Sequence, residues 1–130
     1  MRAVREQYMG KALNELRILI VEDEPVLSLD LQDILADLGH RVVGTAPRLE
    51  PAIDLARNAD FDVAVLDVNL GGERIDPVAD IIAKRGLALV FVTGYGEAPA
   101  GHTTAPILKK PYHTGELEKA IQKALIPPHE

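Results

Sequence analysis

Short apolar runs alternate with longer segments of helical pattern along most of this chain. The apolar runs are continuous, as in residues 18–21, Ile-Leu-Ile-Val. A continuous run of β-branched and aliphatic residues is typical of a strand that is covered on both faces. The pattern predicts five strands, at residues 18–21, 42–43, 63–66, 87–92 and 106–108.

Helical spacing of apolar residues predicts a helix after most of these strands. Pro25 suits the first turn of the first helix and Gly39 its end. Further helices are expected around residues 51–56 and 78–82, and Thr114 is expected to cap a last one. The exception is the segment after the fourth strand, where glycines and a proline indicate a loop over residues 94–105.

Strands that alternate with helices predict an α/β fold, with a doubly wound parallel sheet and helices on both faces. The pattern places one domain at residues 17–126. Residues 1–16 are expected to form a flexible N-terminal extension or a short extra helix, and residues 127–130 a short tail.

Composition and charge narrow the function. The chain has 130 residues, which fits one domain, and its formal charge of -6 disfavours binding to nucleic acid. It has no cysteine and only four histidines, so zinc and thiol chemistry lack ligands. No apolar stretch is long enough to span a membrane and no leader pattern is present, so we expect a cytoplasmic protein.

Polar side chains follow the predicted strands at the edge where such folds bind ligands. The groups are Glu22-Asp23-Glu24, Asp67-Val68-Asn69, Thr93-Gly94 and Lys109-Lys110-Pro111. Acidic clusters at neighbouring strand ends repel each other unless a cation lies between them, and carboxylate oxygens suit Mg²⁺. A metal, a hydroxyl and an ammonium can together hold a phosphoryl group, and an aspartate can accept it as an acyl phosphate.

Each of these residues also has a simpler interpretation. Glu24 fits a helix cap or a solvated loop charge, Thr93 a loop residue, and one of Lys109 and Lys110 a surface charge. The four strand-end groups together are more specific than any one of them, because each is a different kind of group and each lies at the end of its own predicted strand.

These residues make the chain resemble the receiver domain of bacterial response regulators over about residues 17–126. The matching stretches are ILIVEDEP (18–25), VAVLDVNL (63–70), FVTGYGE (91–97) and ILKKPY (107–112). The resemblance implies a flavodoxin-like sheet of strand order 2-1-3-4-5. It also implies phosphoryl transfer from a sensor histidine kinase or a histidine phosphotransferase, and no enzymatic activity beyond the domain's own phosphorylation and dephosphorylation.

The resemblance also implies a role for each site residue. Asp67 is the expected phospho-acceptor, Thr93 would bind a phosphoryl oxygen, and Lys110, the lysine directly before a proline, would pair with the phosphoryl charge. The expected Mg²⁺ site comprises Asp23, Asp67, the backbone carbonyl of Asn69 and, through water, Glu22. The family usually has a cis bond before the proline that follows the lysine.

Two departures concern the family's switch. Residues 91–96 partly match a subgroup named for a Phe-Ala-Thr-Gly-X-Tyr motif, with Val92 for alanine and Tyr95 one position early. Ile107 stands where most receivers carry an aromatic switch residue. Tyr95, or movement of the loop at 94–105, is therefore expected to replace the usual switch.

Two other functions compete with phospho-acceptance. A haloacid-dehalogenase-like phosphatase needs a second aspartate where this chain has Asn69, and a pseudo-receiver is expected to lack one of the site residues, all of which are present. Since little follows Ile126, no output domain is expected. Output is expected through a downstream protein partner, a relay or a phosphate sink, from a monomer or weak dimer that binds neither nucleic acid nor membrane.

Overall fold

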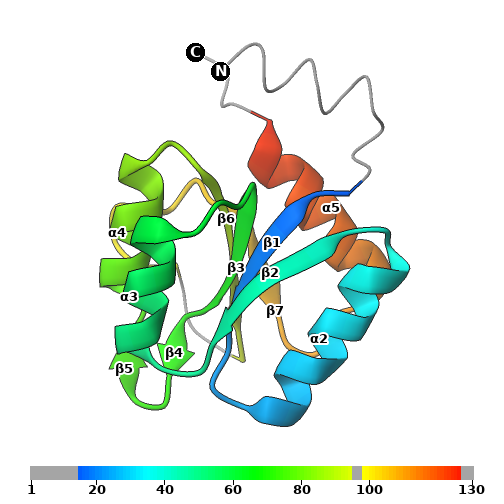
Figure 1. Cartoon of the computed structure of the whole chain (residues 1–130), viewed down its shortest axis with the longest axis horizontal. Helices are drawn as coiled ribbons and strands as arrows, with labels where there is room; N and C mark the ends of the chain where they lie inside the picture. The colour runs from blue at the N-terminus through cyan, green and yellow to red at the C-terminus, as the bar shows by residue number, and fades with distance from the viewer. Residues whose placement is uncertain (1–14, 95–97, 127–130) are drawn as a thin grey trace.

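The computed structural model describes residues 15–94 and 98–126, and its centre is a parallel sheet (Figure 1). The five strands of this sheet are β1 (Arg17–Val21), β2 (Arg41–Ala46), β3 (Val63–Asp67), β6 (Ala88–Thr93) and β7 (Ile107–Lys109). They lie in the order β2-β1-β3-β6-β7, and every pair is parallel. Counted in chain order within the sheet, this is 2-1-3-4-5, so the predicted fold is confirmed.

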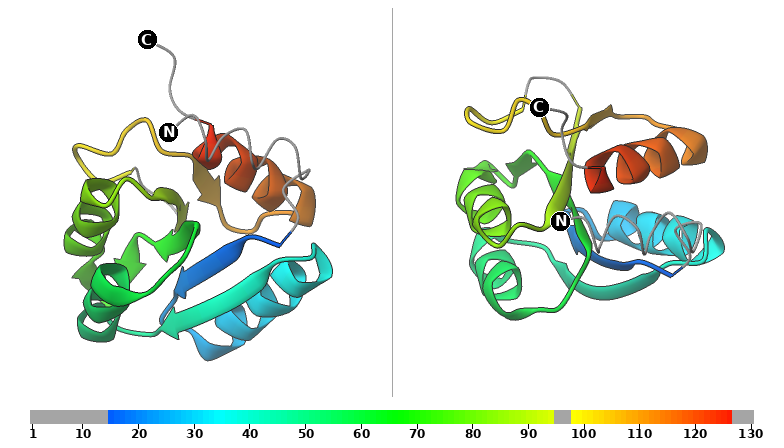
Figure 2. Two further views of the ribbon diagram at one scale, coloured as in Figure 1. Left: turned by 45° about the horizontal axis from the view of Figure 1, so that its top comes forward. Right: turned by 90° about the horizontal axis from the view of Figure 1, so that it is seen from above.

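Helices cover both faces of the sheet, as the view from above shows (Figure 2). The helices are α2 (Pro25–Asp37), α3 (Leu49–Asn58), α4 (Asp76–Lys84) and α5 (Thr114–Leu125). The two faces carry separate apolar cores, one beneath α3 and α4 and the other beneath α2 and α5. Every residue of β3 is buried, as expected for the central strand of a sheet covered on both sides.

The helix ends follow the sequence signals with one exception. Pro25 is the first residue of α2, and Gly39, at φ +90°, adopts a left-handed conformation after its end. Thr114 does not cap α5, which is a correction, because the helix already begins at Thr114 and His113 is its cap. The reason is Glu116, whose carboxylate accepts the backbone N–H of His113 at 2.8 Å.

The connection between β6 and β7 contains no helix in its described residues, 98–106, which confirms the predicted loop there. This loop packs on the α3 and α4 side of the sheet through Ala98 and Ala105. His102 lies 2.7 Å from Asp80 of α4 and packs edge-on against Phe91 of β6. The expected role of Tyr95 falls on residues 95–97, which lie outside the described residues.

A small hairpin that the sequence pattern did not predict follows β3. It pairs β4 (Asn69–Leu70) with β5 (Glu73–Arg74) in antiparallel fashion. Its turn is Gly71-Gly72, both with positive φ, which side chains other than glycine adopt at a cost. The hairpin begins at Asn69, two residues after the end of the central strand β3, so it lies at the carboxyl edge of the sheet.

The domain core starts slightly earlier than the predicted boundary. Leu16 is fully buried among the residues beneath α2 and α5, and its N–H donates to Nδ1 of His40 at 3.2 Å. The expectations for the rest of the N-terminal extension and for the tail concern residues 1–14 and 127–130, which lie outside the described residues.

Candidate functional site

A cleft of about 250 Å³ lies at the carboxyl edge of the sheet, at the position that the strand-end groups predicted. The loops after β1 and β3 and the ends of β6 and β7 form it. Its lining consists of Asp23, Glu24, Asp67, Asn69, Gly71, Gly72, Thr93, Gly94 and Lys110. The parallel register brings these groups together, since neighbouring strands all end at one edge.

Three carboxylates meet in or beside this cleft. Glu22, Asp23 and Asp67 each offer an oxygen, and these oxygens lie within 4.8 Å of one another. Glu22 and Asp67 are buried, whereas Asp23 is half-buried. Such a cluster of like charges is costly in a partly desolvated place unless cations offset it.

Asp67 is the last residue of β3, and both of its carboxylate oxygens have partners. Oδ1 accepts the backbone N–H of Asn69 at 3.1 Å, and Oδ2 accepts a hydrogen bond from Nζ of Lys110 at 3.1 Å. Only 6% of the residue is exposed. The carboxylate is therefore held in one orientation at the wall of the cleft.

Lys110 directly follows β7 and bridges two of the three acids. Its Nζ also donates to Oε1 of Glu22 at 3.3 Å. Burial lowers the pKa of Lys110, but the hydrogen bonds and charges of Asp67 and Glu22 outweigh burial, so its pKa is raised. Lys110 therefore stays charged, and the peptide bond to Pro111 is cis, as the resemblance implied.

Burial has the opposite consequence for the acid beside it. It raises the pKa of Glu22 from 4.5 to about 7, and the charge of Asp67 adds to the rise. The backbone N–H of Glu24, which donates to Oε2 of Glu22 at 3.1 Å, and the charge of Lys110 oppose it. The ammonium of Lys110 thus pairs with two carboxylates of a cluster that contains three, Glu22, Asp23 and Asp67.

Thr93 and Asn69 complete the predicted set. Thr93 is the buried last residue of β6, and its carbonyl accepts the N–H of Lys110 at 2.8 Å, which ties the two strand ends together. The side chain of Asn69 accepts the N–H of Gly72 at 2.9 Å and so shapes the hairpin. Its backbone carbonyl as a metal ligand remains a prediction, as do the assigned roles of the other site residues.

Some features of the site were not predicted. Gly71 and Gly72 line the cleft, and a Cβ at Gly71 would meet a carboxylate oxygen of Asp23 at 3.7 Å, an ordinary contact distance. The Gly71-Gly72 pair is the feature of the sequence from which this hairpin turn could have been predicted. Tyr112 is half-buried near the acids, and its pKa is raised by burial and then by the charge of Glu22. Glu24 stands at the cap position of α2, but its side chain makes no cap hydrogen bond.

The donor set fits a hard divalent cation. Oxygen ligands at this spacing suit Mg²⁺, which takes one or two carboxylates and keeps several waters. A cation there would offset the charge that Lys110 leaves unbalanced. The arrangement can then present an aspartate oxygen to a phosphorus centre between a metal, an ammonium and a hydroxyl.

Residues 18–122 match the family model of the response regulator receiver domain, and the chain belongs to this family. Its members work in two-component signalling and typically bind Mg²⁺ at an acidic pocket, which agrees with the acidic cluster.

Similar proteins include the phyllosphere-induced regulator PhyR of Methylorubrum extorquens, 31% identical over 114 residues, which are 83% of this chain and 43% of PhyR. The solution structure of SdrG from Sphingomonas melonis Fr1 is similar with 36% identity and a TM-score of 0.77, over 86% of this chain and 98% of SdrG. A structure described as the anti-anti-sigma factor PhyR from Bartonella quintana is 26% identical with a TM-score of 0.72, over 85% of this chain and 48% of that one. The chain spans about half the length of the curated relatives it matches.

Within the described ranges, no helix combines the length and the apolar character that crossing a membrane requires.

Proposed function

We propose that Asp67 accepts a phosphoryl group from a phosphohistidine of a sensor histidine kinase or a histidine phosphotransferase, in a Mg²⁺-dependent reaction. An oxygen of Asp67 forms the new bond to phosphorus as the bond to the histidine nitrogen breaks, and an acyl phosphate results. The observation that carries the proposal is the buried, oriented Asp67 with Lys110 at 3.1 Å, in a cleft that Thr93 also lines.

The charges of the site support this reaction. A phosphoryl group brings further negative charge to three carboxylates, so the transfer needs cations beside it. Lys110 supplies one positive charge, and Glu22, Asp23, Asp67 and the carbonyl of Asn69 would hold Mg²⁺, which supplies the remainder. Thr93 would donate its hydroxyl to a phosphoryl oxygen.

An exposed apolar patch beside the cleft supports docking of the phosphodonor. Val26 is 75% exposed and Leu29 61% exposed, and both lie in the first turns of α2, directly after the acidic loop. A partner that covers these side chains would bring its phosphohistidine to the open side of the cleft. Exposed apolar side chains next to a reactive group favour a protein donor.

We propose further that the domain acts through other proteins and catalyses only its own phosphorylation and dephosphorylation. A downstream partner, relay to a phosphotransferase and a phosphate sink are the candidate outputs. Binding of a protein partner is supported by the similar structure that is described as an anti-anti-sigma factor. Residues 91–94, Phe-Val-Thr-Gly, favour the Phe-Ala-Thr-Gly-X-Tyr subgroup.

Incubation with acetyl phosphate tests the proposal without any partner. Intact-protein mass spectrometry is expected to show one added phosphoryl group with MgCl₂, and none with a chelator or in Asp67→Asn. Asp60→Asn, an exposed aspartate seven positions earlier, is the matched control and keeps the modification. Absence of the added group in the wild-type protein, or its retention in Asp67→Asn, overturns the proposal.

A further inference from the structure

Glu24 is an acid of the Asp67 cleft to which the proposed reaction gives no role. It lines the cleft together with Asp23 and Asp67, but it does not belong to the carboxylate cluster that would hold Mg²⁺. The residue is exposed, and its side chain makes no cap hydrogen bond to α2. Within the described part of the chain, its carboxylate has neither a hydrogen bond nor an ion pair. This negative charge is therefore available to a molecule that enters the cleft.

The local backbone holds Glu24 beside the acidic cluster. Its N–H donates to Oε2 of Glu22 at 3.1 Å, and its carbonyl accepts the N–H of Ser28 at 3.0 Å. Pro25 follows it, and a residue before proline is restricted to extended backbone, which agrees with φ -93° and ψ 116° at Glu24. The backbone of Glu24 is thus fixed at the wall of the cleft, and only its side chain rotates.

The rest of the lining leaves room beside the reactive groups. Three residues of the lining contribute no side chain: Gly71, Gly72 and Gly94. A Cβ at Gly72 or at Gly94 would meet no atom within 4 Å, so open space lies beside them. Lys110, the cation of the lining, already donates to two acids. A leaving group can therefore occupy the same cleft of about 250 Å³ that Glu24 lines.

The charge of the leaving group differs between two chemical classes of phosphodonor. In both, an oxygen of Asp67 forms the new bond to phosphorus. With a phosphohistidine whose ring is protonated, the P–N bond breaks and neutral imidazole leaves with the electron pair. With an acyl phosphate, the P–O bond breaks and a carboxylate leaves with the electron pair and a negative charge. A nearby carboxylate attracts the cationic ring and repels the departing anion.

We propose that Glu24 is a specificity-determining residue, which makes the cleft favour phosphohistidine-type donors over acyl phosphates. The inference rests on the proposed phospho-acceptance by Asp67 and adds the class of donor that the cleft prefers. Acyl phosphates still react, but Glu24 slows them relative to donors whose leaving group is cationic or neutral. The domain is thereby partly insulated from small acyl phosphates.

The size of the cleft sets the size of the effect. A sphere of 250 Å³ is about 8 Å across, so a leaving group lies within roughly that distance of Glu24. Two unit charges about 8 Å apart change a rate about two- to threefold in water, and more where water is partly excluded. We therefore expect Glu24 to change the preference between the two donor classes by about threefold.

A comparison of two small donors tests the proposal on the full chain. Phosphoimidazole stands for the phosphohistidine class and acetyl phosphate for the acyl phosphates. Second-order rate constants for phosphorylation are measured at saturating MgCl₂ by quenching and intact-protein mass spectrometry. The ratio of the phosphoimidazole rate to the acetyl phosphate rate should fall about threefold in Glu24→Gln and about tenfold in Glu24→Lys. Added NaCl should bring the wild-type ratio closer to that of Glu24→Gln, because salt screens exposed charges.

The ratio separates specificity from a merely structural role. Both donors use the same Asp67 and the same Mg²⁺, so damage to the fold or to the metal site lowers both rates and leaves the ratio unchanged. Glu50→Gln makes the same charge change in the first turn of α3, outside the cleft lining. This control should keep the wild-type ratio.

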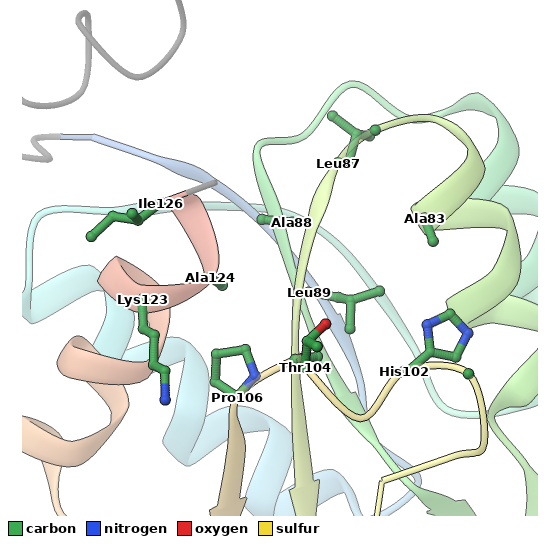
Figure 3. A pocket seen from close by; sticks show the side chains of 13 residues that line it. Ala83, Leu87, Ala88, Leu89, His102, Thr104, Pro106, Lys123, Ala124 and Ile126 are labelled. Atoms are coloured by element: carbon green, nitrogen blue, oxygen red, sulfur yellow. The ribbon is translucent and has the colours of Figure 1, made fainter. Parts of the chain in front are cut away.

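A second control lies at the opposite edge of the sheet. A groove of about 700 Å³ is found there, at the amino end of β6, and Lys123 is among its lining residues (Figure 3). It is remote from Asp67, because β6 runs from Ala88 at the groove to Thr93 at the cleft. Lys123→Gln should therefore change neither the ratio nor its dependence on salt.

Three results would overturn the specificity role of Glu24 while leaving phospho-acceptance intact. They are an unchanged ratio in Glu24→Gln, an equal fall of the ratio in Glu50→Gln or Lys123→Gln, and a wild-type ratio that does not respond to salt. If neither donor modifies Asp67 in the wild-type protein, the proposed function fails and this inference fails with it.

Discussion

Replacement of Lys110 tests whether its ammonium offsets the charge of the acidic cluster. Its ammonium donates to Asp67 at 3.1 Å and to Glu22 at 3.3 Å, and its side chain is 25% exposed. Replacing it with methionine keeps most of the side-chain volume and removes the charge. Lys109→Met makes the same chemical change on an exposed neighbour, so it is the matched control.

The expected loss of stability follows from these contacts. A hydrogen bond between charged groups contributes roughly 1.5–3 kcal/mol, and two such bonds are lost in Lys110→Met. Partial exposure screens the pair, and Glu22, whose pKa is raised to about 7, can take up a proton once the ammonium is gone. We therefore expect a net loss of about 2 kcal/mol, or a melting temperature lower by about 8 °C.

Mg²⁺ should reverse much of this loss. A cation among the acids replaces the missing positive charge, and in Lys110→Met no ammonium competes with it. The free energy of unfolding, from urea titration followed by circular dichroism, is measured with EDTA and with millimolar MgCl₂. The difference between the two variants should narrow from about 2 kcal/mol in EDTA to under about 1 kcal/mol in MgCl₂.

Two outcomes would refute this reasoning. If Lys110→Met is as stable as Lys109→Met in EDTA, the ammonium does not offset the carboxylates. If MgCl₂ stabilises both variants equally, the cation does not bind among the acids that Lys110 bridges.

Three further predictions concern the fold. Burial lowers the pKa of His40, so the unfolded chain binds a proton at this residue more tightly than the folded protein does. The contribution of neutral His40 to the free energy of unfolding is therefore full above the ordinary pKa of 6.5 and is lost as pH falls. Thermal melts of His40→Gln should depend less on acidification than those of the wild type, and an unchanged slope would contradict this. Gly72 has φ +91°, so Gly72→Ala should lower the free energy of unfolding, measured by urea titration, by about 1–2 kcal/mol. Gly115→Ala in α5 is the control and should raise it by up to about 1 kcal/mol. Equal effects of the two substitutions would argue against strain at the hairpin turn. Phe61→Ala, in the core, should cost about 3–5 kcal/mol and Leu29→Ala, on the surface, under about 0.5 kcal/mol, and a small loss for Phe61 would contradict its packing.

The sheet could be predicted because strands that are buried on both faces consist of continuous apolar runs, which are visible in the sequence. The central strands β1, β3 and β6 are apolar except for one terminal residue each, and the apolar runs predicted each strand to within one residue of its observed ends. β2 lies at the edge of the sheet, where exposed Thr45 and half-buried Gly44 are tolerated, so only its first half looked like a strand. The edge position explains why the prediction for 42–43 was too short.

The site could be predicted as a set of residue types but not as a geometry. Parallel strands end at one edge, which was enough to bring Asp67, Thr93 and Lys110 together. The hairpin after Asp67 was missed because its strands have two residues each, too few to show alternation. Thr114 was assigned as a cap from its residue type alone, whereas the observed end depends on how Glu116 reaches back to the chain.

The most direct test of the central claim locates the acyl phosphate in the chain. After incubation with acetyl phosphate and MgCl₂, borohydride reduces an aspartyl phosphate to homoserine, and peptide mass spectrometry then identifies the converted position. The account predicts homoserine at position 67 and at no other aspartate, and unconverted protein when Mg²⁺ is chelated. Conversion at Asp23 or another acid, or none at all in the phosphorylated sample, would contradict it.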